Sequence, residues 1–333
     1  MPPLIQVKHL VKEYKTFDRR EGLSGAMLDL FSREYKTLRA VDDVSFEIQS
    51  GDMVGYIGAN GAGKSTTLKV LCGILYPSSG EVTVDGRVPW KDREAHVQNI
   101  GAVFGQRSQL WWDLAAGESL RLLAHIYGVS DNEYKSRMDE FEQVLRLREF
   151  LKTPARKLSL GQKMRCELAA SLIHNPKVLF LDEPTIGLDV VVKQSIREFV
   201  RRINRERQVT VILTTHDLRD IEELCSRVLI IDKGKVVFDG TLENLRAMSL
   251  DSAHLSFSLS KPVGKDWRPE GLPTSGIVWT AEGATLKALL TRHAPPRTDV
   301  IRAVLDRYGQ GVEDIAIAEP QIEHVVSRIY ESK

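Results

Sequence analysis

Runs of consecutive apolar residues recur along the first 240 residues of the chain. They include positions 53–57, 178–181, 209–215 and 228–231. Runs that are apolar at nearly every position predict strands buried on both faces, as in a parallel sheet. Helical patterns lie between these runs, so we expect an α/β fold in which helices cover both faces of a mostly parallel core sheet.

Other segments of this part of the chain follow different patterns. Residues 44–48 and 81–84 alternate between apolar and polar positions, which predicts strands of an antiparallel flank. Residues from about 107 to 170 show helical periodicity, many charges and no convincing strand. We therefore expect a helical subdomain inserted into the α/β core.

A shorter insertion is expected near the amino-terminal end, over about residues 21–34. Leu23, Met27, Leu30 and Phe31 fall at i, i+4, i+7 and i+8, which places them on one face of a helix. The pattern therefore predicts an amphipathic helix between the first two strands.

The pattern changes after residue 248. Short alternating strands are predicted at 255–259 and 276–280, and helical patterns follow at 298–308 and 321–330. About 85 residues are enough for a small α+β domain. We expect two domains, residues 1–248 and an accessory domain at 249–333, and we find no chemical motif in the second.

The composition narrows the classes of function. Lys and Arg number 46 against 45 Asp and Glu, and the net charge of +1 argues against a general nucleic-acid-binding protein. No stretch approaches the ~20 apolar residues needed to cross a bilayer, and the first residues lack the pattern of a secretory signal. The three cysteines are widely scattered, as is usual in a reducing cytosol. We expect a cytoplasmic protein without a nucleic-acid partner.

A phosphate-binding sequence follows the first of these apolar runs. Residues 58–65 match the pattern G-x-x-x-x-G-K-[ST], between the run at 53–57 and a helical pattern at 66–73. Glycines let the backbone wrap around phosphate oxygens, and the following helix adds the positive end of its dipole. Lys64 is expected to reach the terminal phosphates, and the Ser65 hydroxyl to bind Mg²⁺. The expected cofactor-binding residues are Gly58, Ala59, Asn60, Gly61, Ala62, Gly63, Lys64, Ser65 and Thr66.

Two acidic residues, Asp182 and Glu183, end the apolar run at 178–181. The carboxyl ends of strands are where α/β sheets place their ligands. We expect Asp182 to hold Mg²⁺ through water. Glu183 is the expected general base that activates an attacking water molecule.

With these motifs, the chain resembles the ATP-binding subunits of ABC transporters over residues 4 to about 248. Residues 158–162, Leu-Ser-Leu-Gly-Gln, are similar to the signature sequence Leu-Ser-Gly-Gly-Gln. Gln106 resembles the Q-loop glutamine, residues 187–189 resemble the D-loop, and His216 resembles the switch histidine. The resemblance implies a P-loop NTPase fold and ATP hydrolysis.

The resemblance also implies individual roles. Gln106 would contact Mg²⁺ or the attacking water, and His216 would stabilise charge that develops on the γ-phosphate. The signature would bind the γ-phosphate of an ATP held by the opposite subunit, so two copies of the chain would close around two nucleotides. The residues implied to act on that opposite ATP are Ser159, Gly161 and Gln162.

Four aromatic residues have two interpretations each. In the family, an aromatic side chain stacks on adenine, and this chain has two candidates for that role. Tyr14 directly follows the first strand pattern, whereas Tyr35 has the more usual distance to the second strand. Trp111 and Trp112 follow Gln106, where the family docks its membrane partner; they are either core residues or docking residues. The helix at 21–34 either packs on its own sheet or contacts a membrane subunit.

Two positions depart from the family pattern. Leu160 replaces the usual glycine at the third position of the signature, and Ile186 stands where the D-loop commonly has serine. Because Ser159 and Gln162 are retained, we expect activity to survive.

The resemblance is strongest to exporter ATPases of the drug and polysaccharide type. It implies a subunit that powers a separate membrane permease and is held by that partner at the inner face of the membrane. An importer or lipid-extraction ATPase is the alternative. A soluble non-transport ABC protein is the weaker alternative, because the chain has one nucleotide domain and no long heptad run. The transported substrate and the role of the accessory domain cannot be inferred from the sequence.

Overall fold

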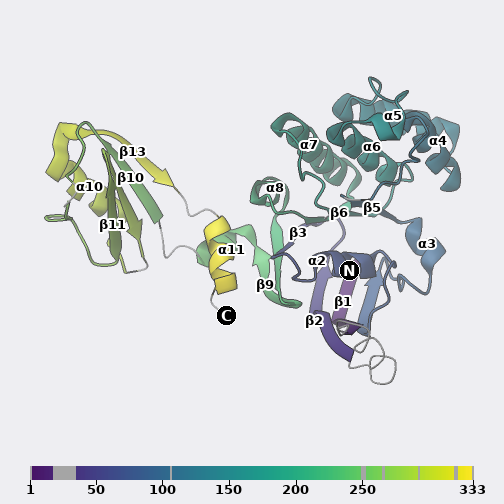
Figure 1. The fold of residues 1–333 in the computed structure, drawn as a ribbon, viewed down its shortest axis with the longest axis horizontal. Coiled ribbons are helices and arrows are strands. Elements are labelled where there is room, and N and C mark those ends of the chain that lie inside the picture. Colours follow the sequence, from purple (N-terminus) through teal and green to yellow (C-terminus); the bar gives the residue numbers. More distant parts are fainter. Residues whose placement is uncertain are drawn as a thin grey trace, which may run out of the picture. The chain divides into compact units, whose positions relative to one another are not determined.

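The computed structural model divides into two compact units, Met1–Gly240 and Thr241–Lys333 (Figure 1). The helix expected at 21–34 and the side chain of Gln106 lie outside the residues that the structure describes. Those residues are 2–17, 35–105, 107–248, 253–264, 267–291, 293–318 and 322–331.

The centre of the first unit is a six-stranded sheet. Its strand order is β5 (Ile100–Phe104), β6 (Val178–Asp182), β7 (Thr210–Thr214), β3 (Met53–Gly58), β8 (Arg227–Asp232) and β9 (Lys235–Thr241). The pairs from β5 to β8 are parallel, and every residue of β3 and β7 is buried. The expectation of a mostly parallel core sheet is therefore confirmed, because strands covered on both faces need apolar side chains on both.

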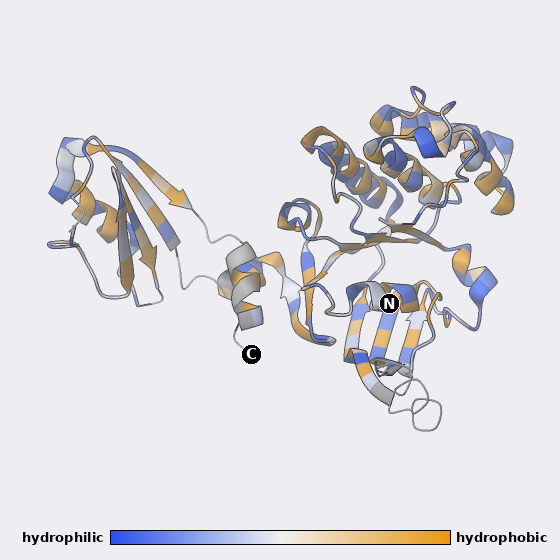
Figure 2. Ribbon diagram, in the orientation of Figure 1, coloured by the Kyte–Doolittle hydropathy of each residue, from blue (hydrophilic) through white to orange (hydrophobic). Residues whose placement is uncertain are grey.

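A second, antiparallel sheet forms the expected flank. It contains β2 (Tyr35–Ile48), β1 (Ile5–Phe17) and β4 (Ser79–Val84), with β1 in the middle. Figure 2 shows apolar and polar residues alternating along these strands, the pattern of a sheet with one face on a core. β1 runs to Phe17, so Tyr14 lies inside this strand and not after it as expected. Pairing with β2 continues the strand, because Tyr14 lies opposite Leu38.

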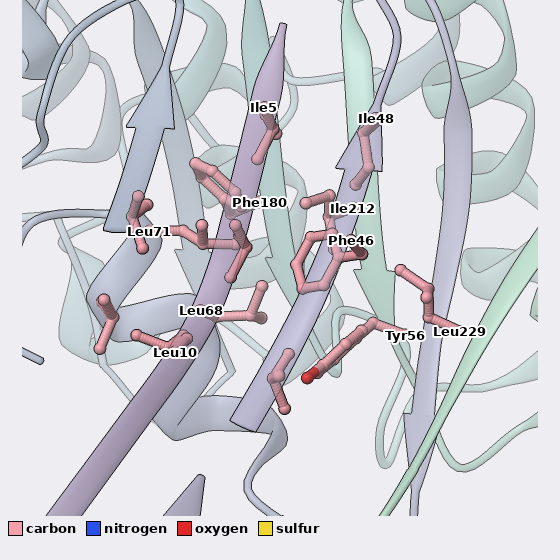
Figure 3. Close-up of a cluster of buried hydrophobic side chains, with 14 of the residues drawn as sticks. Ile5, Leu10, Phe46, Ile48, Tyr56, Leu68, Leu71, Phe180, Ile212 and Leu229 are labelled. Carbon is pink, nitrogen blue, oxygen red and sulfur yellow. The ribbon is translucent and has the colours of Figure 1, made fainter. Parts of the chain in front are cut away.

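Helix α2 (Lys64–Leu71) packs between the two sheets. Its residues Leu68 and Leu71 are fully buried in a cluster that includes Ile5 from the flank and Phe180 and Ile212 from the core sheet (Figure 3). The helix begins at Lys64, two residues earlier than its apolar pattern predicts. Because both sheets hold α2, the loop that precedes it has a fixed position.

Helices cover the other face of the core sheet (Figure 1). The inserted helical subdomain consists of α4 (Ala116–Ile126), α5 (Asp131–Leu145), the short helix Ala155–Lys157 and α6 (Leu160–Leu172). The remaining helices in the described part of this unit are α3 (Arg93–Val97), α7 (Val190–Arg207) and α8 (Leu218–Leu224). Phe141 of α5 meets Phe199 of α7 edge to face, with ring centroids 5.5 Å apart, which joins the subdomain to the core helices.

The second unit is a four-stranded antiparallel sheet with helices. Its strand order is β11 (Ile277–Glu282), β12 (Thr285–Leu290), β10 (Ala253–Leu259) and β13 (Val312–Ala318). Helix α10 (Arg297–Tyr308) places Val300 and Val304 in a core with Phe257 and Leu286. The expected domain boundary after residue 248 lies at the end of α9 (Leu242–Met248), which packs on α11 (Ile322–Glu331) within this unit.

Two strands of this unit, β12 and β13, were not expected from the pattern of apolar and polar residues. β12 follows β11 after a turn of two residues, Gly283 and Ala284, and pairs with β11 and β10. Among the described residues, no helix combines the length and apolar composition that a membrane span requires.

We expect Leu68→Ala to lower the free energy of unfolding of the chain by about 2–5 kcal/mol, because the substitution leaves a cavity between the two sheets. Leu68 is fully buried, whereas Leu38 on the flank is 58% exposed. Leu38→Ala is the matched control, with an expected loss below about 1 kcal/mol. Urea denaturation measures both, and equal losses would contradict the packing described here.

Candidate active site

The phosphate-loop sequence connects β3 to α2. Two of its glycines have left-handed backbone, Gly61 with φ of 80° and Gly63 with φ of 107°. A Cβ on Gly63 would lie 2.2 Å from the carbonyl oxygen of Ala40, so only glycine fits there. The loop can therefore turn its N–H groups toward one point in front of α2.

Lys64 folds back over this loop. Its Nζ donates hydrogen bonds to the carbonyl oxygens of Gly58 at 2.6 Å and Ala59 at 3.1 Å. Burial lowers the pKa of Lys64, and the nearby carboxylates of Glu183 and Asp182 act in the opposite direction. The side chain is thus a buried amine placed between the loop and two acids.

Two buried hydroxyls brace the start of α2. Tyr56 on β3 donates a hydrogen bond to Thr67 Oγ1 at 3.2 Å, and Thr67 donates to the carbonyl oxygen of Gly63 at 3.1 Å. Burial raises the pKa of Tyr56 well above its usual value, so it stays a neutral donor. This chain fixes the helix end that faces the loop.

A cavity of about 320 Å³ lies beside the loop. It brings together three residues that the sequence analysis assigned to the site, namely Ser65, Asp182 and Glu183. The other lining residues are Lys69, Ile74, Phe104, Gly105, Arg107 and Ile186. Ile186 was noted in the sequence as a departure from the D-loop. The other five residues were not expected at the site, because their segments carry no phosphate-binding motif.

Asp182 is oriented by a neighbouring strand. Thr214 at the end of β7 donates a hydrogen bond to Asp182 Oδ1 at 2.6 Å, and the two residues are paired in the sheet. Ser65 and Asp182 offer a hydroxyl and a carboxylate oxygen to one cavity, the ligand types that Mg²⁺ prefers. The described residues contain no group of three or more metal-ligating His, Cys, Asp or Glu side chains. An ion here would need further oxygens from phosphate or water.

Glu183 has a strained backbone. Its φ is 57°, a conformation that side chains with a Cβ rarely adopt. Its N–H donates to both the carbonyl oxygen and the hydroxyl of Thr214, at 3.0 and 3.2 Å, which holds the strained turn. Such strain is typical of functional positions.

Glu183 and His216 meet directly. His216 Nε2 lies 2.7 Å from Glu183 Oε1, although the two residues follow different strands, β6 and β7. The Glu183 side chain is 26% exposed and the His216 side chain is 45% exposed, so the pair is accessible at the surface of the fold. The structure thus brings the two expected catalytic residues into contact.

The signature segment lies elsewhere. Ser159 caps α6: its hydroxyl accepts a hydrogen bond from the Gln162 N–H at 3.2 Å, and Gln162 Oε1 accepts one from the Ser159 N–H at 2.9 Å. This reciprocal cap starts α6 at Leu160. Ser159, Gly161 and Gln162 are not among the residues that line the cavity of their own chain.

A buried acid on α6 holds the segment after Gln106. Glu167 accepts hydrogen bonds from the hydroxyl of Ser108 and from the N–H of Gln109 at 3.0 Å. Burial raises the pKa of Glu167, and these hydrogen bonds act in the opposite direction. Glu167 was not expected to support the site, because a single acidic residue inside a helix forms no motif.

The two candidates for adenine stacking, Tyr14 and Tyr35, lie on different strands. Tyr14 is half-buried on β1, and Lys12 Nζ lies 5.3 Å from the centre of its ring. Tyr35 begins β2, where it pairs with Phe17. Stacking of either ring on adenine stays a prediction.

Comparison with known proteins agrees with the motifs. Residues 41–186 match the family described as ABC transporter. The chain is 35% identical over 215 residues to the ABC transporter ATP-binding protein NatA of Bacillus subtilis (strain 168), covering 65% of this chain and 87% of that protein. It is 30% identical over 298 residues to the daunorubicin resistance ATP-binding protein DrrA3 of Streptomyces coeruleorubidus, covering 90% and 93%.

The fold is also similar to a solved structure, the ATP-binding cassette MJ0796 as a dimer in a post-hydrolysis state with ADP and Pi. The TM-score is 0.60 at 27% sequence identity, and the match covers 72% of this chain and 98% of the other. The nearly complete coverage of that cassette indicates that its whole fold is present in this chain.

We expect Lys64→Ala to weaken nucleotide binding by about 10- to 100-fold, since a hydrogen bond to a charged group contributes about 1.5–3 kcal/mol. Titration with a fluorescent ATP analogue measures the dissociation constant. Lys177→Ala is the control, because Lys177 is exposed and pairs with Asp85. Unchanged affinity in Lys64→Ala would contradict the expected role.

Proposed function

The chain belongs to the ATP-binding proteins of ABC transporters, and on this basis we propose that it hydrolyses ATP at the Glu183–His216 pair to power a separate membrane permease. The observation that carries the proposal is the 2.7 Å contact between these two side chains, beside the cavity that Ser65 and Asp182 line. Acid, histidine and phosphate loop come from different strand ends and converge at one edge of the core sheet.

In the proposed mechanism, Glu183 takes a proton from the attacking water. Its strained turn fixes where the carboxylate points, and a positioned base of this kind contributes about 10²–10⁴-fold to rate. His216, which contacts Glu183 Oε1, would stabilise the charge that develops on the γ-phosphate. Lys64 neutralises charge on the terminal phosphates from within the loop.

Mg²⁺ is the proposed metal, and it would neutralise phosphate charge when bound. Ser65 and Asp182 are the proposed ligands within the described residues, with Asp182 acting through water. Thr214 keeps Asp182 Oδ1 oriented. Gln106, a third proposed ligand, lies outside the described part of the chain.

A second copy of the chain is the proposed partner for each ATP. The signature residue Ser159 does not line the cavity of its own chain, so it would serve the nucleotide of the partner copy. An exposed apolar surface supports this arrangement: Leu160, Ile186, Val190 and Val191 are 47–81% exposed. Ile186 also lines the nucleotide cavity, so this surface is continuous with the site.

Two tryptophans support a docking surface for the permease. Trp111 and Trp112 are 38% and 65% exposed, so the interpretation of both as core residues is wrong. Their backbone is anchored: the Trp111 N–H donates to Ser119 Oγ, and the Trp112 carbonyl accepts from the N–H of Arg156. Exposed aromatic side chains on an anchored backbone are typical anchors of protein interfaces.

Export is the proposed direction of transport. The similarity to a daunorubicin resistance protein extends over 298 residues, so it reaches beyond the first unit into the second. The permease would hold the chain at the inner face of the membrane. Import or lipid extraction is the alternative, and identification of the co-purifying membrane proteins distinguishes them.

Glu183→Gln should bind ATP but hydrolyse it at least about 10²-fold more slowly, because the general base is lost. With ATP bound and uncleaved, we expect dimers to accumulate in sedimentation experiments at saturating ATP. Ser159→Arg in the same background should bind ATP and stay monomeric, since the long side chain blocks the partner's site. Glu183→Gln monomers at saturating ATP would contradict the two-copy arrangement.

Trp112→Ala should leave the ATPase activity of the purified chain near the wild-type value, while transport by the complete permease complex falls at least about tenfold. Trp112→Phe is the matched control, because it keeps an aromatic anchor and should retain most transport. Parallel loss of ATPase activity and folding in Trp112→Ala would instead identify a structural residue.

A further inference from the structure

A buried ionic cluster lies behind the catalytic pair. Asp220 on α8 is fully buried, and its Oδ1 accepts a hydrogen bond from Arg197 Nε on α7 at 2.6 Å. Its Oδ2 accepts hydrogen bonds from the hydroxyls of Thr185 and Thr215, the latter at 2.9 Å. All four residues are buried. We call Thr185, Arg197, Thr215 and Asp220 the Asp220 cluster.

The two threonines sit next to the catalytic candidates in the sequence. Thr185 comes two residues after Glu183, and Thr215 directly precedes His216. Since both hydroxyls bind the same oxygen of Asp220, the loop after β6 and the loop after β7 are tied to one point. The relative position of Glu183 and His216 therefore depends on that oxygen.

The chemistry of the Asp220 cluster indicates that it fixes the positions of its members and does not merely stabilise the fold. Removing a carboxylate and a guanidinium from water is costly, and apolar side chains of similar volume often stabilise a core as well or better. In the Asp220 cluster each carboxylate oxygen is hydrogen-bonded, and Arg197 Nη1 also binds Glu223 Oε1 at 2.7 Å. A fully satisfied buried network permits one arrangement of its members.

We propose that Asp220 is a positioning residue for ATP hydrolysis, which sets the separation of Glu183 and His216 through Thr185 and Thr215. The inference rests on the catalytic roles proposed above. Asp220 is not among the residues that line the nucleotide cavity, so it acts through the two threonines. Arg197 holds the carboxylate in place from α7.

The test removes the two hydroxyls with little change of shape. Thr185→Val and Thr215→Val should each lower kcat of the purified full-length chain about tenfold, because small misplacements of catalytic groups are costly. The KM for MgATP should change less than about twofold, since the phosphate loop is untouched. The double variant should fall about as far as either single variant, because both hydroxyls serve one clamp and their effects are not additive.

Two controls separate positioning from stability. Thr185→Ser and Thr215→Ser keep the hydroxyl, so each variant should retain most of the wild-type kcat. Thr210→Val makes the same substitution at a fully buried threonine that begins β7, where the hydroxyl accepts a hydrogen bond from the Gly51 N–H at 2.8 Å. It should lower the thermal midpoint of unfolding and leave kcat unchanged.

Each outcome decides between the alternatives. Folded Thr185→Val and Thr215→Val variants that keep wild-type kcat would overturn the positioning role, as would an equal loss of kcat in Thr210→Val. Strictly additive losses in the double variant would also overturn it. A wild-type chain without any ATPase activity, alone or with its permease, would overturn the proposed function itself, so the two failures are distinguishable.

Discussion

Main-chain N–H groups can hold a phosphate only where the chain turns tightly enough to aim several of them at one place. Here that turn needs the left-handed backbone of Gly61 and Gly63, and the carbonyl of Ala40 leaves no room for a side chain at the second. The turn must also stay fixed against thermal motion. Burial of α2 between two sheets provides this rigidity, so the core of the first unit also fixes this short loop.

Much of this arrangement could be predicted, because its signals are local. Apolar runs identified the buried strands, and a dense motif identified the phosphate loop between one of them and its helix. The adjacent acids at the end of β6 indicated the hydrolytic edge, and the structure places Asp182 and Glu183 in the same cavity as Ser65. The order of motifs along the chain then identified the family.

The rest depends on which segments become neighbours in space, and a single sequence does not contain that information. Thr214, Glu167 and Asp220 look like ordinary residues of a strand and two helices, yet each supports part of the site. The strand that contains Tyr14 continues past its apolar pattern because β2 pairs with it. β12 is fixed by pairing with both β10 and β11, which its own short pattern does not reveal.

Leu160 has a consequence of its own for the D-loop. A Cβ on Gly187 would lie 3.2 Å from Leu160 Cδ2, and Gly187 also has φ of 70°. The side chain of Leu160 in one motif therefore crowds the space that a side chain at position 187 in the other would need. A small residue at 160 would remove only this crowding, because the left-handed backbone at position 187 would still favour glycine.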